Sequence, residues 1–214
     1  MPILTRHEIL DRLDQTDLRK KLLVSPLLDR KRQVSLNSID VRLGTDFIVI
    51  QQTNLTCVDP AHGKEFEQNL GRYQERVQLS FGEPFILHPG QLVLGCTLEF
   101  IGLPEGVCGQ ILGRSSWGRL GLISATAPFI ASGFRGVVTL ELENLGQIPV
   151  VVYPGYMIAQ LVLQETSGVT PYEGKYSSPT TVEYAKLSAV DPKEEIDFWS
   201  NSESFGRAET DPET

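Results

Sequence analysis

Hydrophobic and polar residues alternate in short runs along most of the chain between residues 38 and 163. The clearest run is 137–143, with one face formed by Val138, Leu140 and Leu142 and the other by Thr139, Glu141 and Glu143. A period of two is typical of a β-strand, because successive side chains point to opposite faces. This run therefore predicts a strand with one hydrophobic face and one face that carries carboxylates.

Similar runs predict further strands, with glycine or proline between them. They lie at residues 38–43, 47–50, 85–89, 91–100, 107–112, 148–153 and 156–163. In the last run, Ile158, Gln160 and Val162 are expected to share a face. Residues 51–78 are polar, so we expect an excursion between strands there. Many short strands separated by turn residues favour an all-β barrel or sandwich.

One segment near the N-terminus has helical periodicity instead. Thr5 followed by Glu8 is a capping box, in which each side chain satisfies a backbone N–H at the start of a helix. Ile9, Leu10 and Leu13 then recur at helical spacing. The pattern predicts a short amphipathic helix over residues 5–14 that packs against the strands.

Composition narrows the function classes. A chain of 214 residues with 41% hydrophobic and 21% charged residues is long enough for one generous domain, or one domain with extensions. The net charge is −8, and residues 191–214 hold eight acidic and two basic residues, typical of a solvated, mobile tail. There is no basic stripe, so nucleic acid is not an expected partner.

Membrane and secretion signals are also missing from the pattern. No hydrophobic run approaches the ~20 residues of a membrane helix, and no basic-then-hydrophobic leader opens the sequence. We therefore expect no membrane partner and a cytoplasmic location. Cys57, Cys96 and Cys108 are widely spaced and odd in number, which predicts reduced thiols.

The candidate chemistry begins in the sequence GRSSWGR at residues 113–119. Arg114, Ser115, Ser116 and Arg119 supply two guanidinium groups and two hydroxyls beside a glycine. Such a loop suits a polyanion, because all of these groups can donate hydrogen bonds to phosphate oxygens. Glu141, on the predicted strand that follows, is either a general base or a structural anion paired with an arginine. The basic run at residues 30–32 is most simply a solvated loop, with an anion contact as the alternative.

Several better-known catalytic sites are excluded by spacing. The three histidines and three cysteines do not form the HxE and PCxxC motifs of a zinc nucleobase deaminase, and no metal ligands of the protein are expected. The serines lack the GxSxG motif of a hydrolase, and no histidine follows them. The loop also lacks the GKS or GKT ending of a phosphate-binding P-loop.

The ordered motifs GRSSWGRLGL, TAPFIASGFRG, VTLELEN and IAQLVL resemble the dCTP deaminase branch of the dUTPase superfamily. IDVRLG at residues 39–44 and LHPGQLVLGCTLEFIGLP at 87–104 are similar to the same family. The resemblance implies a mostly β fold, a dUTPase-like distorted β-barrel with a short N-terminal helix. It also implies a homotrimer with sites at subunit interfaces, and Mg²⁺ carried on the nucleotide triphosphate. The expected organisation is a domain over residues 1–176, with its active-site core at 113–146, and a C-terminal extension over 177–214.

The resemblance implies an enzyme that deaminates dCTP to dUTP and ammonia, a hydrolase acting on a cyclic amidine C–N bond. Glu141 would be the general base for water attacking C4 of cytosine, with Ser115 positioning that water and Arg119 near the glutamate and the base. The residues expected to bind the nucleotide are Arg114, Ser116, Thr126, Ala127, Gln160, Tyr172 and Lys175.

This sequence departs from the family pattern in ways that leave alternatives open. Where the family usually has Ile-Asp-Pro-Gly, residues 130–133 read IASG, and Ala131 cannot replace the aspartate that helps dUTP-hydrolysing members activate water. The segment 122–126 is about one residue shorter than usual, and the lid motif lacks its glutamine after Tyr176. The alternatives are a dUTP diphosphatase, a deaminase of a modified deoxycytidine nucleotide, and a non-catalytic nucleotide-binding or regulatory homologue.

Overall fold

The computed structural model describes residues 2–51, 57, 69, 72–125, 129–167 and 178–184. The chain separates into two compact units, of which the first comprises Met1–Gln51 and Gln74–Tyr184. The second comprises Gln52–Tyr73 and Ala185–Thr214, and nearly all of it lies outside the described residues. All of the elements that follow belong to the first unit.

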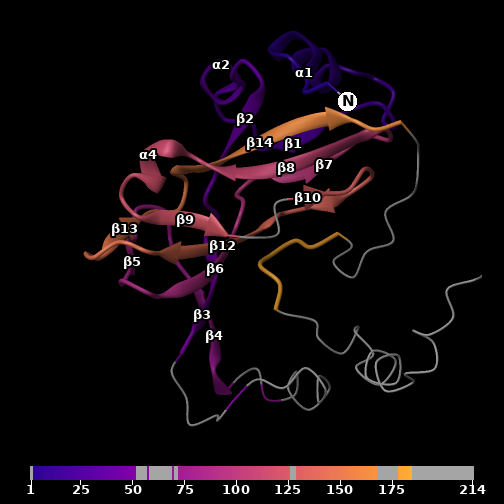
Figure 1. Cartoon of the computed structure of the whole chain (residues 1–214). Coiled ribbons are helices and arrows are strands. Elements are labelled where there is room, and N and C mark those ends of the chain that lie inside the picture. The colour runs from indigo at the N-terminus through magenta and orange to yellow at the C-terminus, as the bar shows by residue number, and fades with distance from the viewer. Residues whose placement is uncertain are drawn as a thin grey trace, which may run out of the picture. The chain divides into compact units, whose positions relative to one another are not determined.

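The first unit is built mainly of short strands, with a few short helices (Figure 1). The helices are α1 (Arg6–Leu13), α2 (Arg30–Gln33) and α4 (Ser115–Gly118). The strands are β1 (Leu23–Ser25), β2 (Ser38–Arg42), β3 (Asp46–Ile50), β4 (Gln74–Gln78), β5 (Phe85–Leu87), β6 (Leu92–Cys96), β7 (Phe100–Gly102), β8 (Val107–Gly113), β9 (Leu122–Ala125), β10 (Phe129–Ile130), β11 (Arg135–Gly136), β12 (Thr139–Asn144), β13 (Val150–Val152) and β14 (Met157–Glu165). The prediction of a mostly β fold with a short N-terminal helix is confirmed.

Antiparallel pairing arranges these strands in four sheets. Their orders are β4-β3-β6-β12-β9, β10-β8-β14-β2, β1-β7-β11 and β13-β5. The five-stranded sheet contains β12, and the four-stranded sheet contains β8, which leads directly into α4. Strands from distant parts of the sequence thus become neighbours of the two segments that carry the candidate chemistry.

Burial along the strands follows the alternation in the sequence. On β12, Leu140 and Leu142 are buried while Thr139, Glu141 and Glu143 are half-buried, as predicted. On β14 a register shift between Met157 and Ala159 brings Ile158 inward. Ile158 therefore does not follow the alternation that Gln160 and Val162 keep, which corrects the prediction for that run.

The N-terminal helix α1 has the predicted capping box. The side chain of Thr5 accepts from the N–H of Glu8, and the carboxylate of Glu8 accepts from the N–H of Thr5 at 2.7 Å. Ile9 is the buried contact of this helix with the strands. None of the helices in the described part of the chain is long and hydrophobic enough to cross a membrane.

Several elements were not predicted, namely the strands β1, β4, β9, β10 and β11 and the helix α2, and the single strand expected over residues 91–100 is divided into β6 and β7. The most polar of the missed elements are β4 and α2. β4 lies in the stretch expected to be an excursion, and it pairs with β3. Its sequence QERVQ has few hydrophobic residues because it forms the edge of its sheet and most of its side chains are at least partly exposed. α2 is a single turn in the basic run, and the side chain of Asp29 caps it by accepting from the N–H of Arg32 at 3.1 Å. Both patterns are too short and polar to give a periodic signal.

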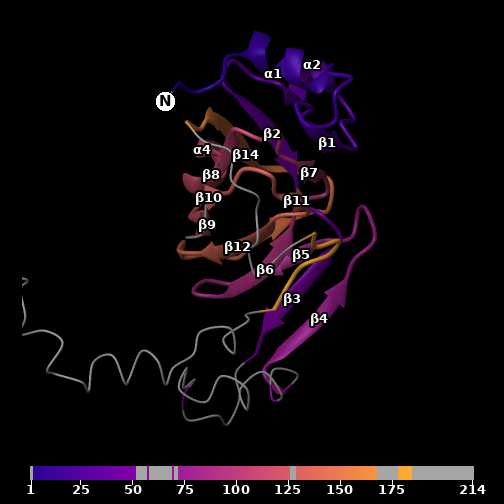
Figure 2. The ribbon, with the colours of Figure 1, turned by 90° about the vertical axis from the view of Figure 1, so that its right-hand side faces the viewer.

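A strap formed by residues 178–184 packs against the body (orange in Figure 2). Val182 is fully buried beside Ile48, Cys96 and Val137. The guanidinium group of Arg76 donates to the carbonyl oxygen of Val182 at 3.0 Å and lies 5.3 Å from the ring centroid of Tyr184. These contacts fasten the strap to β4 and to the segment just before β12.

Thiol reactivity tests the packing beneath the strap. Burial, followed by the nearby charge of Asp46, raises the pKa of the Cys96 thiol from 9.0 to about 11. Thiolate is the reactive form, so ~10⁻³ of this thiol is ionised at pH 8. Cys108 is also buried, whereas Cys57 is exposed. We expect iodoacetamide to modify Cys57 rapidly in the native protein and Cys96 and Cys108 only after unfolding in urea. Mass spectrometry of timed samples measures this, and rapid native labelling of Cys96 would contradict the buried position.

Candidate functional site

The predicted phosphate-binding loop is a single helical turn rather than an irregular loop. β8 ends at Gly113, Arg114 takes an extended conformation before the turn, and α4 follows. The carbonyl oxygen of Arg114 accepts from the N–H groups of Trp117 and Gly118 at 3.0 and 3.1 Å, which closes the turn. The indole N–H of Trp117 donates to the carbonyl oxygen of Met157 at 2.9 Å. The turn is therefore fixed to the start of β14.

This turn leaves its polar side chains accessible. Ser115, Ser116 and Arg119 are exposed, and Arg114 is half-buried. The hydroxyl groups of Ser115 and Ser116 and the guanidinium group of Arg119 can therefore reach the oxygens of a polyanion from solvent. The accessibility that the predicted role requires is thus present at these positions.

Glu141 lies half-buried in the middle of β12. In the register, it is opposite Leu94 of β6 and Ala125 of β9. β9 is the strand that follows α4, and α4 packs beside it (Figure 1). One strand therefore connects the polar turn to the position directly beside the predicted general base.

The turn between α4 and β9 is in close backbone contact with the turn that follows β12. Gly121, which follows α4, has a φ of +88°, and a Cβ there would lie 2.5 Å from the nitrogen of Gly146. The N–H of Leu145 donates to the carbonyl oxygen of Gly121 at 2.8 Å. A side chain at Gly121 would therefore separate the turn that follows β12 from the turn that follows α4.

A buried carboxylate organises two of the predicted nucleotide-binding residues. Asp40 of β2 is 7% exposed, and its Oδ1 lies 3.4 Å from Nε of Arg114. The same oxygen accepts from Nε2 of Gln160 at 3.3 Å. Arg114 also donates to the carbonyl oxygen of Met157 at 3.3 Å. Asp40 was predicted only as a strand residue in IDVRLG, and the structure gives it the role of orienting Arg114 and Gln160.

Arg114 and Ser116 line a cavity of about 540 Å³. The other residues around it lie on α2 and β2, in and just after α4, and at and just before the start of β14. They are Arg32, Arg42, Trp117, Leu120, Gly155, Tyr156 and Met157. Three of the lining residues are arginines and none is acidic. We refer to this space as the arginine cavity. Ser115, Arg119 and Glu141 are not among its lining residues.

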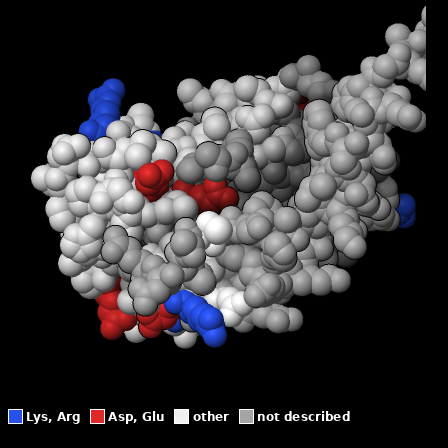
Figure 3. All heavy atoms as spheres, turned by 60° about the horizontal axis from the view of Figure 1, so that its bottom comes forward, with Lys and Arg blue, Asp and Glu red and all other residues white. Residues whose placement is uncertain are grey.

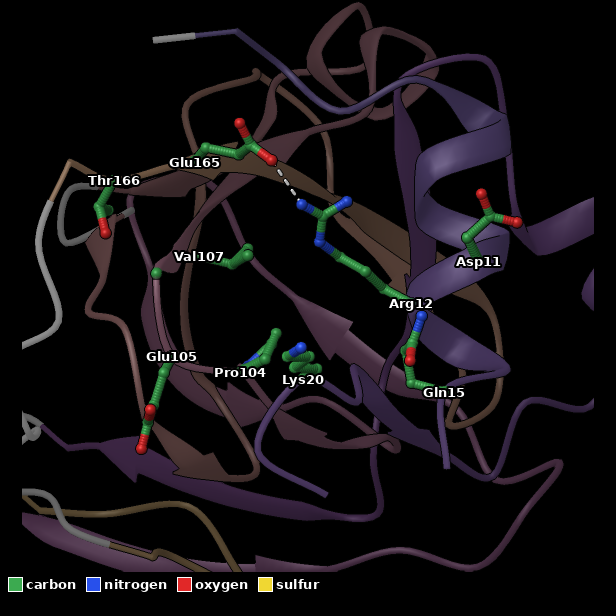
Figure 4. A pocket seen from close by; sticks show the side chains of 10 residues that line it. Asp11, Arg12, Gln15, Lys20, Pro104, Glu105, Val107, Glu165 and Thr166 are labelled. Carbon is green, nitrogen blue, oxygen red and sulfur yellow. Dashed lines mark hydrogen bonds and ion pairs between the residues drawn. The ribbon is translucent and has the colours of Figure 1, made fainter. Parts of the chain in front are cut away.

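A second cavity, of about 440 Å³, lies between α1 and the turn from β7 to β8 (Figure 4). Its charged lining is mixed, with Asp11, Glu105 and Glu165 against Arg12 and Lys20. Arg12 forms an ion pair with Glu165 at 2.5 Å, which uses its charge within the protein. This cavity therefore lacks the single sign of charge that the arginine cavity has.

The lysine and arginine side chains coloured in Figure 3 do not form a stripe. On that face, they stand apart from one another, and some lie beside acidic side chains. A continuous basic surface is what binding to a nucleic-acid backbone would use. The arginine cavity, by contrast, brings three arginines together with no acidic residue in its lining.

The turn at residues 130–133, which departs from the family pattern, has a structural use for its serine. The hydroxyl group of Ser132 accepts from the N–H of Gly106 at 2.9 Å and lies 3.3 Å from the carbonyl oxygen of Pro104. Gly133 has a φ of +81°, a conformation that glycine adopts without strain. Ala131 offers no polar side-chain atom to a ligand. Arg135, on β11, lies in a different sheet from Glu141.

Not all of the predicted site residues lie in the described part. Thr126, Ala127, Tyr172 and Lys175 fall outside the described residues. Among the others, the structure brings Arg114, Ser116 and Gln160 close to Asp40 or to the arginine cavity. Ser115 and Arg119 lie in and directly after α4, which packs beside β9, while Glu141 lies on β12, which pairs with β9. Arg42 and Tyr156 were missed because nothing in their local patterns distinguishes them from surface residues.

The donor atoms present fit a triphosphate better than a metal ion bound by the protein alone. No group of three or more histidine, cysteine, aspartate or glutamate side chains lies close enough to hold a metal ion in the part of the chain that the structure describes. Guanidinium and hydroxyl groups bind phosphate oxygens. A Mg²⁺ ion that uses the phosphate oxygens as ligands is compatible with such a site, since Mg²⁺ often binds through substrate phosphates.

Comparisons with known proteins agree with these features. A family model described as dCTP deaminase-like matches residues 3–166. A dCTP deaminase of Halorubrum lacusprofundi is 43% identical over 164 residues, covering 76% of this chain and 77% of the relative. A protein of Halobacterium salinarum named dCTP deaminase, dUMP-forming, is also 43% identical over 164 residues, covering 76% of this chain and 80% of the relative.

A solved structure shares the fold. The crystal structure of 2'-deoxycytidine 5'-triphosphate deaminase from Agrobacterium tumefaciens matches with a TM-score of 0.57 and 26% sequence identity. The match covers 77% of this chain and 46% of the chain in that structure. The likeness therefore extends over most of this protein and about half of that one.

Proposed function

This chain belongs to the dCTP deaminase-like family, and from that premise we propose that it is a zinc-independent dCTP deaminase that releases dUTP and ammonia. The observation that carries the proposal is the position of Glu141. It lies half-buried beside β9, and β9 continues from the turn that bears Ser115, Ser116 and Arg119. A carboxylate linked through one strand to a turn of phosphate-binding groups can act as the general base for attack of water on a bound nucleotide.

In the proposed reaction, Glu141 takes a proton from water as the oxygen attacks C4 of cytosine. The C4–N bond then breaks, and Glu141 passes protons to the departing ammonia, leaving a carbonyl group at C4. Ser115 positions the water, and Arg119 stabilises negative charge near the glutamate and the base. The backbone at Thr126 and Ala127 reads the pyrimidine, and Arg114, Ser116 and Gln160 hold phosphates. Tyr172 and Lys175 are proposed to contact the nucleoside and the triphosphate.

The metal ion and the assembly belong to the same proposal. Mg²⁺ would reach the site on the triphosphate and neutralise part of its charge, while the arginines bind the remaining oxygens. We propose a homotrimer with shared sites, which is supported by exposed hydrophobic side chains, among them Leu120, Phe129 and Tyr156. Light scattering of the purified protein tests the trimer. A cytoplasmic location completes the proposal.

The product is the point on which the family divides. Some relatives are named dUMP-forming, which means that the same protein also removes diphosphate. We propose that this chain stops at dUTP, because Ala131 has no group that could activate a second water. Ser132, the neighbouring hydroxyl, is used in hydrogen bonds with the turn from β7 to β8.

The test is incubation of the purified protein with dCTP and Mg²⁺, with nucleotides resolved by anion-exchange chromatography and ammonia assayed separately. We expect dUTP and ammonia in equal amounts. Formation of dUMP and diphosphate would refute the proposed end point while leaving deamination intact. Binding without any product from dCTP, dUTP, CTP or modified cytosine nucleotides would replace the enzyme with a nucleotide-binding homologue.

A further inference from the structure

The arginine cavity is more cationic than the predicted phosphate-binding residues alone would make it. Arg114 and Ser116 form one side, and Arg32 of α2 and Arg42 of β2 extend the lining. No acidic side chain lines the cavity, although acidic residues outnumber basic ones in the chain as a whole, 27 to 19. Its volume of about 540 Å³ lies within the range of small-molecule sites, ~300–1,000 Å³. A ligand with several negative charges fits such a space.

Two of the three guanidinium groups are already held in place. Arg42 donates from Nη1 to the carbonyl oxygen of Gly155 at 2.7 Å, and its Nε is buried without a hydrogen-bond partner in the described structure. Arg114 is held by Asp40 and by the carbonyl oxygen of Met157. Donors fixed before the ligand arrives lose less side-chain entropy on binding.

The buried residue Glu99 sets the spacing between α2 and β2. Its carboxylate accepts from Nε2 of Gln33 at 2.9 Å and from the N–H of Arg42 at 2.8 Å. Gln33 directly follows Arg32 on α2. The two arginines are thus carried by elements that one fully buried side chain joins. Arg32 itself is exposed, and its side chain makes no hydrogen bond or ion pair within the part of the chain that the structure describes.

We propose that the arginine cavity is the triphosphate end of the nucleotide site, with Arg32 and Arg42 binding the terminal phosphates alongside Arg114 and Ser116. The inference rests on the proposed function for the identity of the nucleotide. It adds two residues, Arg32 and Arg42, as determinants of the preference for a triphosphate over a monophosphate. Planar guanidinium groups are suited to this role because they bind phosphate through paired hydrogen bonds.

The experiment compares binding of dCTP, dCMP and inorganic triphosphate by isothermal titration calorimetry. All variants are made in the full chain carrying Glu141→Gln, so that slow turnover does not disturb the titration. Arg32→Gln is expected to weaken dCTP binding about tenfold, the loss of one charge-assisted contact, and to leave dCMP binding unchanged. Arg42→Lys keeps the charge but loses the paired geometry, so the ratio of dCTP to dCMP affinity should also fall.

Lys31→Gln is the matched control, because Lys31 is exposed on the same helix and does not line the cavity. It removes the same charge and should change dCTP affinity less than twofold, because salt screens the interaction between the ligand and a charge that does not contact it. If Arg32→Gln and Lys31→Gln weaken dCTP binding equally, the proposed contact between Arg32 and the triphosphate is wrong, and the loss reflects a general effect of charge. Thermal unfolding shows whether the Arg42→Lys variant is folded. If it is not folded, the Arg32→Gln variant alone decides whether the arginine cavity binds the triphosphate.

The two proposals fail separately. If the wild-type protein deaminates dCTP while Arg32→Gln and Arg42→Lys bind it with full affinity, the role of the cavity is overturned and the enzyme stands. A second outcome is that no nucleotide is deaminated, but inorganic triphosphate binds and Arg32→Gln weakens this binding. That outcome supports the proposed role of the arginine cavity and contradicts the proposed enzymatic activity. Absence of binding by both dCTP and inorganic triphosphate would overturn the cavity proposal.

Discussion

Replacing Glu141 with glutamine is expected to lower the rate of dCTP deamination by ~10²–10⁴-fold, the usual contribution of a general acid–base group. Glutamine has nearly the same shape as glutamate, so β12 and its two neighbours should keep their register. The amide cannot accept a proton from water at neutral pH, however. Nucleotide affinity should change little, because the phosphates are bound by other residues. Steady-state assays of ammonia release and calorimetric titration with dCTP measure the two quantities.

Glu143→Gln provides a matched control on the same strand and face. Glu143 is also half-buried, but it is opposite Leu92 and Ile123, one step of ~6–7 Å along the strand. We expect this variant to retain most of the activity. Equal losses in the two variants would mean that the charge of the β12 face matters rather than a single base. Full activity in Glu141→Gln would remove Glu141 from the mechanism.

Asn144→Ala is expected to destabilise the protein strongly. The side chain is fully buried and donates to the carbonyl oxygens of Leu87 and Ile148 at 2.9 and 2.8 Å. Its Oδ1 accepts from the N–H of Gly146 at 2.9 Å. Alanine would leave all three backbone groups without this partner, at a cost of about 3 kcal/mol in the free energy of unfolding. Urea unfolding followed by circular dichroism measures the change.

Asn37→Ala is the comparison for this prediction. Asn37 is exposed and makes one side-chain hydrogen bond, to the carbonyl oxygen of Leu4 at 3.3 Å. Its replacement should cost less than about 1 kcal/mol. Asn144→Asp keeps the acceptor but sets a carboxylate against two carbonyl oxygens, so it should be at least as destabilising as alanine. Similar stability of Asn144→Ala and Asn37→Ala would contradict the buried network.

Local patterns were sufficient for the strands and the helix whose hydrophobic residues alternate or recur. The capping box of Thr5 and Glu8 begins α1, and the two faces of β12 are those that the sequence predicts. Polar elements were beyond such reasoning. β4 and α2 exist because of pairing with β3 and capping by Asp29, and neither has a periodic hydrophobic pattern. The register shift that buries Ile158 depends on the strands beside β14.

The sequence by itself determined the family, the residue types of the polar turn and the face of β12 on which Glu141 lies. These features depend on local sequence, namely the motifs and their order along the chain, and the two-residue period that follows from the geometry of a strand. Only the tertiary structure decided that Asp40 joins Arg114 to Gln160, that Asn144 secures the end of β12, and that Arg32 and Arg42 line one cavity with Arg114. Strand pairing brings together residues far apart in the chain, and no local pattern records which strands will become neighbours.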